Sequence, residues 1–253
     1  MIGPEKAARL GRAHVAVVGL GAVGSYAVEA LARGGVGRLR LVDFDRVQRS
    51  NINRQLFALE STLGQPKAEV AARRVADINP ACAVEPLRLF AHRESLDLVL
   101  GGGIDLLVDA IDAVIPKVEL TAGALARGVP LVSCMGAALR TDPSAVRVGP
   151  LSKAVQCPLA SRVRKLLRRR GFPVDHPCVF SVEPVDRSIP LPPETEDPDT
   201  APPGVRRGRE RRVLGSLPTL TGLMGLLAAH TAMRLLLGGS FAREPALPEG
   251  RTP

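Results

Sequence analysis

The sequence predicts an α/β protein with a Rossmann-like, mostly parallel sheet and helices on both faces of that sheet. Val15–Val18 is a β-branched run of the kind that forms a buried parallel strand. Gly19, Gly21 and Gly24 follow it with the spacing G-x-G-x-x-G. An acid, Asp43, stands about 20 residues further on, as in dinucleotide-binding units. A strand, a glycine turn and an acid in this order predict a nucleotide-binding fold.

The glycine turn leads into a helix that we expect over Ser25–Arg33, and a second strand is expected over Arg38–Val42. Glycine permits tight chain reversal and lets the backbone approach a phosphate closely. The helix then presents free N–H groups and a partial positive charge to an anion. Asp43 ends the second strand, where a carboxylate is placed to bind ribose hydroxyls.

Polar residues after the second strand decide which nucleotide is expected. They are Asp45, Asn51, Arg54, Gln55 and Lys67. A nicotinamide dinucleotide carries only a diphosphate, whereas the β- and γ-phosphates of a triphosphate need cations such as Arg and Lys. The pattern G-x-x-x-x-G-K-[ST] is missing, so the chain is not a P-loop protein. We therefore predict ATP as the nucleotide, the alternative being a solvated loop with ordinary surface cations.

A third strand is expected over Asp105–Val108 and a further one over Leu131–Cys134. Asp112 follows the third strand, and Pro116 and Lys117 stand at the start of another helix. Open α/β sheets build their sites at the carboxyl ends of such strands. A carboxylate there can hold Mg²⁺, which prefers one or two carboxylates together with substrate phosphates. Asp112 is thus a candidate magnesium ligand, and a helix N-cap is the alternative role.

The combined motifs resemble those of the superfamily of ubiquitin-activating enzymes and their bacterial relatives. The resemblance covers roughly residues 1–140 and rests on Gly19–Ser25, Asp43–Asp45, Asn51–Gln55, Lys67 and Asp109–Asp112. It implies that Asp43 binds the ribose of ATP and that Asp112 serves the magnesium ion. It also implies that Asn51, Arg54 and Lys67 hold the phosphates. The shared reaction is attack of a carboxylate on the α-phosphate of ATP, giving an acyl-adenylate and pyrophosphate.

Within that superfamily the chain resembles the family of tRNA threonylcarbamoyladenosine dehydratases. The segments that carry this likeness are Asn51–Gln55, Cys157–Ala160, Cys178–Glu183 and Gly215–Gly222. The resemblance implies ATP-dependent adenylation of the carboxyl group of threonylcarbamoyladenosine in tRNA. An internal carbamoyl atom then displaces AMP and closes a ring. Position 157 is Cys where that family has Asp, which argues against a catalytic role there.

Four cysteines, at positions 82, 134, 157 and 178, include no C-x-x-C pair. A structural zinc site needs closely paired ligands, so no zinc is expected. This argues against the main alternative, an adenylyltransferase that activates the C-terminus of a ubiquitin-like sulfur carrier. More distant alternatives are an NAD-dependent oxidoreductase, which leaves Arg54 and Lys67 unused, and a catalytically idle RNA-binding module. Cys178 is the one cysteine for which we consider a functional role, as the site of a thioester or persulfide. The alternative, and the commoner role of an isolated cysteine, is a buried thiol.

The net charge of +9 and the pI of about 10.2 favour an anionic partner such as nucleic acid. A helix beginning near Leu159 would place its apolar residues on one arc and most of its basic residues on another. These basic residues are Arg162, Arg164, Lys165, Arg168, Arg169 and Arg170. Such a ridge suits the phosphate backbone of tRNA, and a solvated helix face is the alternative. Aromatic residues, at 3% of the chain, are too few for a base-stacking platform.

Residues 1–150 are expected to form the ATP-binding region, and residues 151–253 to belong to the same domain. This second half is expected to be partly irregular, with a mobile loop at about 189–212 and a closing apolar helix over Leu217–Leu237. That helix could also contribute a dimer interface or a peripheral membrane contact. The cysteines and the lack of an apolar leader before Gly11 indicate a cytoplasmic protein. The family resemblance implies tRNA and a second copy of the chain as partners and, in the alternative, a sulfur-transfer protein.

Overall fold

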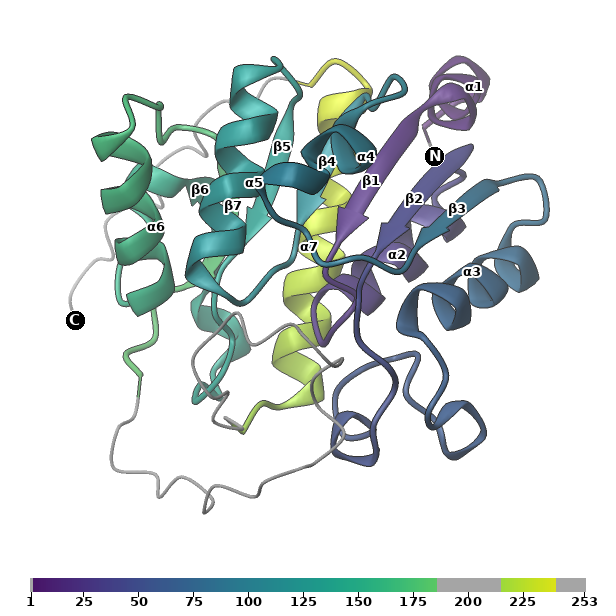
Figure 1. Ribbon diagram of the computed structural model, residues 1–253, viewed down its shortest axis with the longest axis horizontal. Helices are drawn as coiled ribbons and strands as arrows, with labels where there is room; N and C mark the ends of the chain where they lie inside the picture. The colour runs from purple at the N-terminus through teal and green to yellow at the C-terminus, as the bar shows by residue number, and fades with distance from the viewer. Residues whose placement is uncertain (1, 186–214, 240–253) are drawn as a thin grey trace, which may run out of the picture.

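The computed structural model describes residues 2–185 and 215–239, which build a seven-stranded sheet covered by helices (Figure 1). The strand order is β3-β2-β1-β4-β5-β7-β6, and only the pairing of β6 with β7 is antiparallel. The strands are β1 His14–Val18, β2 Arg38–Val42, β3 Ala83–Leu87, β4 Leu106–Asp109, β5 Leu131–Cys134, β6 Val146–Pro150 and β7 Pro177–Ser181. The predicted α/β, mostly parallel fold is confirmed.

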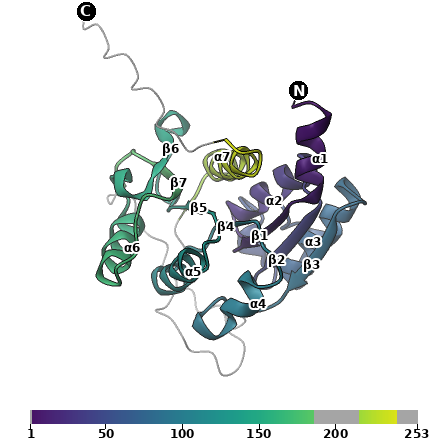
Figure 2. The same cartoon turned by 90° about the horizontal axis from the view of Figure 1, so that it is seen from above.

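Helices cover both faces of the sheet, as predicted (Figure 2). Helices α2, α3 and α7 pack on one face, and α4, α5 and α6 pack on the other. The helices are α1 Pro4–Arg12, α2 Gly24–Arg33, α3 Lys67–Ile78, α4 Leu96–Leu100, α5 Val114–Ala126, α6 Pro158–Arg169 and α7 Pro218–Leu236.

Strand β1 shows why the sequence forms this layered fold. Val15 and Val17 belong to the core under α2 and α7, while Ala16 and Val18 belong to the core under α4 and α5. Successive side chains of a strand point to opposite faces of its sheet. Because both faces are covered, the strand reads as a continuous apolar run rather than as an alternating pattern.

The strands predicted at 15–18, 38–42, 105–108 and 131–134 are found, each within one residue of its predicted bounds. Strand β3 was not predicted. It lies at the edge of the sheet and contains Pro86, a residue that strands accept mainly at edges. Strand β7 was not predicted either, although its short apolar run is fully buried from Cys178 onward.

Helix α7 closes the fold, as predicted from its apolar sequence. It packs against α2 and against β4, β5 and β7. A Cβ at Gly225 would lie 2.4 Å from the Val23 carbonyl oxygen, so the two helices touch backbone to backbone. Within the described segments, no helix is long and apolar enough to cross a membrane. The loop predicted at 189–212 and the last residues of the chain lie outside the described residues.

The topology fixes where a ligand site can form. From β1 the chain moves to β2 and β3 on one side, and then returns to β4 on the other side of β1. The β1–β4 junction is therefore a topological switch point, and ligands of open α/β sheets bind there, outside the carboxyl ends of the strands. Residues that follow β1, β2, β4, β5 and β7 share this carboxyl edge because these strands are parallel.

Candidate nucleotide site

The glycine turn after β1 forms a cradle at the switch point. Gly19 has φ +88°, and a Cβ there would meet the Ala110 carbonyl oxygen at 2.8 Å. A Cβ at Gly24 would collide with the Gly19 carbonyl oxygen, so these two glycines are required by the fold itself. Gly21 differs, because its Cβ would meet only the Gln55 Nε2 atom, at 3.8 Å. The missing side chain at Gly21 leaves open space beside the α2 N-terminus, which is the room a phosphate needs.

Asp43 ties the glycine turn to the end of β2. Its Oδ2 accepts a hydrogen bond from the Leu20 N–H at 2.7 Å, and its Oδ1 accepts one from the Asp45 N–H at 2.9 Å. Burial raises the pKa of this carboxyl group above its ordinary value. A carboxylate has about four lone-pair sites, so two remain for ribose hydroxyls. The structure thus gives Asp43 a positioning role that is compatible with its predicted ribose contact.

Lys67 is a buried cation at the same edge. It is the first residue of α3, and its Nζ lies 3.2 Å from Asp45 Oδ2. Its backbone N–H also donates to the Asp45 carbonyl oxygen, at 3.0 Å. The side chain of Lys67 is only 6% exposed. The structure therefore brings Lys67 and Asp45 together beside Asp43.

The loop between β2 and α3 is folded by its own polar residues. The Asn51 side-chain oxygen accepts a hydrogen bond from the Gln48 N–H at 3.2 Å, which closes a short 3₁₀ turn over Arg49–Asn51. The Leu56 N–H donates to the hydroxyl of Ser25 on the first turn of α2. Asn51 and its neighbour Gln55 are both buried. This loop therefore forms a fixed wall beside the glycine turn.

Arg54 and Asp112 face each other across the site. Arg54 donates hydrogen bonds to the Ser50 carbonyl oxygen at 2.6 Å and to Asn53 Oδ1 at 2.7 Å. Burial lowers the pKa of Arg54, and the nearby charge of Asp112 opposes that shift. Asp112 is exposed after β4. An arginine from the β2 side and a carboxylate from the β4 side therefore flank the switch point.

A buried ion pair beneath the site was not predicted. Lys117 Nζ lies 2.9 Å from Asp109 Oδ2, and both side chains are 0% exposed. Asp109 also accepts a hydrogen bond from the Ser133 hydroxyl, at 2.6 Å. The Lys117 ammonium donates to the Ile111 carbonyl oxygen at 2.9 Å, which fixes the turn that carries Asp112. An acid at the end of β4 and a lysine in the first turn of α5 were visible in the sequence, but their burial was not.

The cysteines are part of the core. Cys134 and Cys178 are buried, and burial raises the pKa of the Cys134 thiol to about 12 and that of Cys178 well above its usual range. Both groups are therefore uncharged thiols, which favours the buried role over a nucleophilic one for Cys178. Cys157 caps α6 by accepting a weak hydrogen bond from the Ala160 N–H, at 3.5 Å. In the described part of the chain, no group of three or more His, Cys, Asp or Glu residues could hold a metal ion.

Helix α6 carries the predicted cationic ridge, with two exceptions. Arg164 turns inward and donates to the carbonyl oxygens of Leu151 and Ala154. Arg170 pairs with Glu119 at 2.7 Å. The other basic side chains are exposed, and we call them the α6 ridge: Arg162, Lys165, Arg168 and Arg169.

The glycine cradle, the acid at the end of β2 and the cations beside them define a nucleotide-binding α/β protein. The chain belongs to the ThiF family, whose model matches residues 1–249.

Named relatives cover most of the chain. It is 45% identical over 182 residues to the tRNA threonylcarbamoyladenosine dehydratase of Bacillus subtilis, covering 72% of each protein. It is 41% identical over 189 residues to the Escherichia coli enzyme of the same name, covering 71% of this chain and 70% of that one. The structure of E. coli TcdA in complex with ATP superposes with a TM-score of 0.79 and 32% identity, covering 93% of this chain and 90% of that chain.

Proposed function

We propose that this protein uses ATP to dehydrate threonylcarbamoyladenosine in tRNA to its cyclic form. The carboxylate of the substrate attacks the α-phosphate, and pyrophosphate leaves. A carbamoyl atom then attacks the activated acyl carbon, and AMP leaves with the oxygen that had linked the two. The carboxylate is already ionised near neutral pH, so the first step needs no general base. One observation carries the proposal. The glycine turn, with Arg54 and Lys67 beside it, lies at the carboxyl edge of a sheet whose fold is shared with an enzyme of this activity.

In this proposal ATP lies across the β1–β4 switch point. Gly19, Gly21 and Gly24 receive its phosphates through the glycine turn and the α2 N-terminus. Asp43 binds the ribose with the lone pairs that Leu20 and Asp45 leave unused. Asn51 and Gln55 shape the wall of the cradle, since both are buried in the loop that faces Gly21.

Arg54 and Lys67 would stabilise the negative charge that develops as pyrophosphate departs. Both are already held in place by hydrogen bonds or an ion pair, so little reorganisation is needed when charge develops. The side chain of Arg54 is half-buried, and partial desolvation strengthens its interaction with an anion.

Asp112 would hold Mg²⁺ together with the phosphates of ATP. The fit rests on donor chemistry, because a single exposed carboxylate beside a phosphate cradle is the kind of protein ligand that Mg²⁺ uses. When bound, the ion neutralises phosphate charge and helps to orient the reacting phosphate. The absence of structural zinc stays a prediction.

The α6 ridge would bind the phosphate backbone of the tRNA. Its four exposed cations lie on one helix, and the net charge of the chain is +9. Such interactions supply affinity but carry little sequence information. The C-terminus of a sulfur-carrier protein remains the alternative substrate, and an assay of the modified nucleoside separates the two.

We further propose that the protein works in the cytoplasm as a homodimer, with residues 1–150 and 151–253 acting as one unit. The exposed face of α7 supplies a candidate contact, because Leu226 on that helix is 49% exposed. The alternative is that the same exposed residues of α7 contact a membrane surface.

The test is incubation with ATP, Mg²⁺ and tRNA bearing threonylcarbamoyladenosine, followed by mass spectrometry of the nucleosides. ATP-dependent loss of one water from the modified nucleoside is expected. An unchanged nucleoside, from protein that is folded and binds ATP, would contradict the proposed substrate and favour a protein carboxyl terminus.

A further inference from the structure

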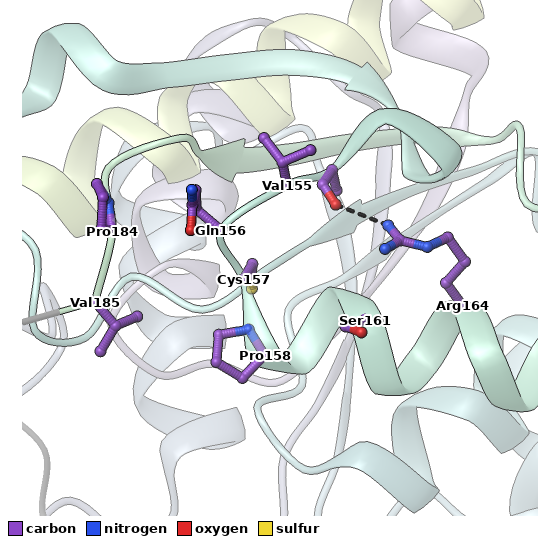
Figure 3. Close-up of a pocket in the computed structure, with 9 residues that line it drawn as sticks. Val155, Gln156, Cys157, Pro158, Ser161, Arg164, Pro184 and Val185 are labelled. Carbon is purple, nitrogen blue, oxygen red and sulfur yellow. Dashed lines mark hydrogen bonds between the residues drawn. The ribbon is translucent and has the colours of Figure 1, made fainter. Parts of the chain in front are cut away.

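A solvent-open cavity of about 540 Å³ lies beside the N-terminus of α6 (Figure 3). Its volume is within the range of roughly 300–1,000 Å³ in which proteins hold small organic ligands. Two short segments and the first turns of α6 form its walls. The lining residues with which a ligand would interact are Val155, Gln156, Pro158, Ser161, Pro184 and Val185.

The walls of the cavity are fixed by one buried arginine. Arg140, which is 3% exposed, donates to the carbonyl oxygens of Gly136, Gln156 and Glu183. It thereby joins the segment after β5, the segment before α6 and the segment after β7. Gln156 adopts φ +54°, a left-handed conformation that non-glycine residues adopt rarely and that surrounding contacts must maintain. The cavity is therefore a built feature of the fold and not a gap between loosely packed loops.

The cavity opens on the same edge of the sheet as the nucleotide site. The segments after β5 and β7 lie at the carboxyl ends of strands parallel to β1 and β4. Val114, two residues after Asp112, packs against the apolar cluster that includes Cys157 at the start of α6. The first turn of α5 therefore lies between the proposed ATP site and the cavity.

The lining suits a flat heteroaromatic ring with a polar rim. Val155, Pro158, Pro184 and Val185 provide apolar surface, and Val155 is 53% exposed. The Gln156 amide can both donate and accept hydrogen bonds, as a base edge requires. Figure 3 shows these residues around the opening, with Ser161 and Arg164 further along the helix.

We propose that this cavity receives the base of an unpaired nucleotide of the tRNA substrate. The inference rests on the proposed function and extends it, since it assigns a base site next to the phosphate-binding ridge. Ser161 lines the cavity and Arg162 of the ridge is the next residue of the same helix. A nucleotide whose base enters the cavity thus has cations close to its phosphate. Enzymes that act on a base take it out of its stack and hold it between apolar or aromatic side chains.

The first test fills the cavity with the variant Ser161→Trp. Ser161 is exposed and lines the cavity, so the added bulk takes up space in the cavity and not in the core. We expect the KM for an anticodon stem-loop bearing threonylcarbamoyladenosine to rise at least tenfold, while the ATP affinity measured by calorimetry stays unchanged. The matched control is Leu98→Trp, which adds the same side chain at a 63% exposed position on α4.

The outcomes separate the inference from the function on which it rests. If the wild-type protein dehydrates the stem-loop and Ser161→Trp keeps its KM, the base site is wrong although the function holds. If Ser161→Trp loses ATP affinity instead, the cavity belongs to the nucleotide and the inference is overturned. If the wild-type protein leaves the nucleoside unchanged, the proposed function itself is wrong.

A second measurement reads the position of the base directly. 4-Thiouridine is placed in turn at each unpaired pyrimidine of the stem-loop, irradiated with the wild-type protein, and mapped by peptide mass spectrometry. At least one position should cross-link to a peptide that contains residues 155–161 or 184–185. Cross-links confined to other peptides would overturn the proposal.

Discussion

The two halves of the carboxyl edge are built in different ways. The nucleotide half, after β1, β2 and β4, is held by side chains that bond to nearby backbone, such as Asp43 to Leu20 and Asn51 to Gln48. The half after β5 and β7 is joined instead by one arginine, Arg140, which reaches three separate segments. The first half presents fixed polar groups, and the second presents a cavity and an exposed ridge.

Under the proposed function this difference has a chemical meaning. ATP is a small ligand whose phosphates must be placed accurately, so its site needs groups that are rigid before binding. An RNA is large and is attracted first by charge, which works from exposed side chains without exact placement. The comparison therefore predicts that substitutions in the first half change the rate of chemistry, and that those in the second half change the binding of RNA.

The largest effect is expected beneath the nucleotide half. Lys117→Met leaves the Asp109 carboxylate buried without its cation, and breaking a buried pair costs about 3–5 kcal/mol. Urea denaturation at neutral pH should show this loss, which the double variant Asp109→Asn/Lys117→Met should partly restore. Lys153→Met, at an exposed lysine, should stay within about 0.5 kcal/mol of wild type. A loss below about 1 kcal/mol for Lys117→Met would show that the buried pair contributes no more to stability than a surface ion pair.

Arg54→Ala should lower kcat for dehydration by about 100- to 1,000-fold, the usual cost of removing one preorganised charge-stabilising donor. The thermal unfolding temperature should change little, because among the described residues the Arg54 side chain donates hydrogen bonds only to its own loop. The control is Arg49→Ala, which removes an exposed arginine that pairs with Glu60. Pyrophosphate release and nucleoside mass spectrometry measure both variants. A decrease of less than tenfold would remove Arg54 from the mechanism.

The stability of the fold should fall in mild acid because of His176. Burial lowers the pKa of this histidine to about 4, while Asp109 and Asp175 act to raise it and Lys117 acts to lower it further. The unfolded chain binds a proton below pH 6.5 whereas the folded chain does not until near pH 4, so stability is lost as the pH falls through this window. At pH 5 the contribution is about 2 kcal/mol less than at pH 7.5.

Urea titrations at these two pH values measure this prediction. His176→Gln should show a smaller difference between them than the wild type does, and His230→Gln, at an exposed position on α7, should not. An equal difference in His176→Gln and wild type would assign the acid sensitivity to other groups.

The smallest effect is expected on the α6 ridge. Arg168→Glu/Arg169→Glu should weaken tRNA binding about tenfold at 0.1 M salt. The slope of log affinity against log salt should become shallower by about 0.7–0.9 for each RNA phosphate that the variant no longer neutralises. Arg9→Glu/Arg12→Glu makes the same change of charge on exposed residues of α1 and should change both quantities less. Equal effects of the two variants would show that the α6 ridge acts only through the net charge of the protein and is not a specific RNA-binding surface.

The strands and helices that carry the nucleotide half could be predicted because they follow one another closely along the chain. Gly19, Gly21, Asp43 and Lys67 come together through local elements whose hydrophobic pattern is strong. The burial of the Asp109–Lys117 pair was not predictable, since charged residues are rarely fully buried. The edge strand β3 was not predicted, because Pro86 and its partly exposed neighbours lack the apolar pattern of a central strand.

The cavity could not have been predicted from the sequence. It is formed by residues near 156, 161 and 184, which meet only after β7 has inserted between β5 and β6. No spacing rule connects Val155 with Pro184. The inward turn of Arg164 was equally hidden, because the helical pattern placed it among the ridge residues while the carbonyl groups that it binds belong to another segment.

The most direct test of the account follows the oxygen atoms of the substrate. Stem-loop RNA whose threonylcarbamoyl carboxylate carries ¹⁸O at both oxygen atoms is incubated with the protein, ATP and Mg²⁺, and the products are read by mass spectrometry. If the carboxylate attacks the α-phosphate, AMP should carry one ¹⁸O for each ring that closes, and pyrophosphate should carry none. Ring closure with unlabelled AMP would contradict adenylation of the carboxylate.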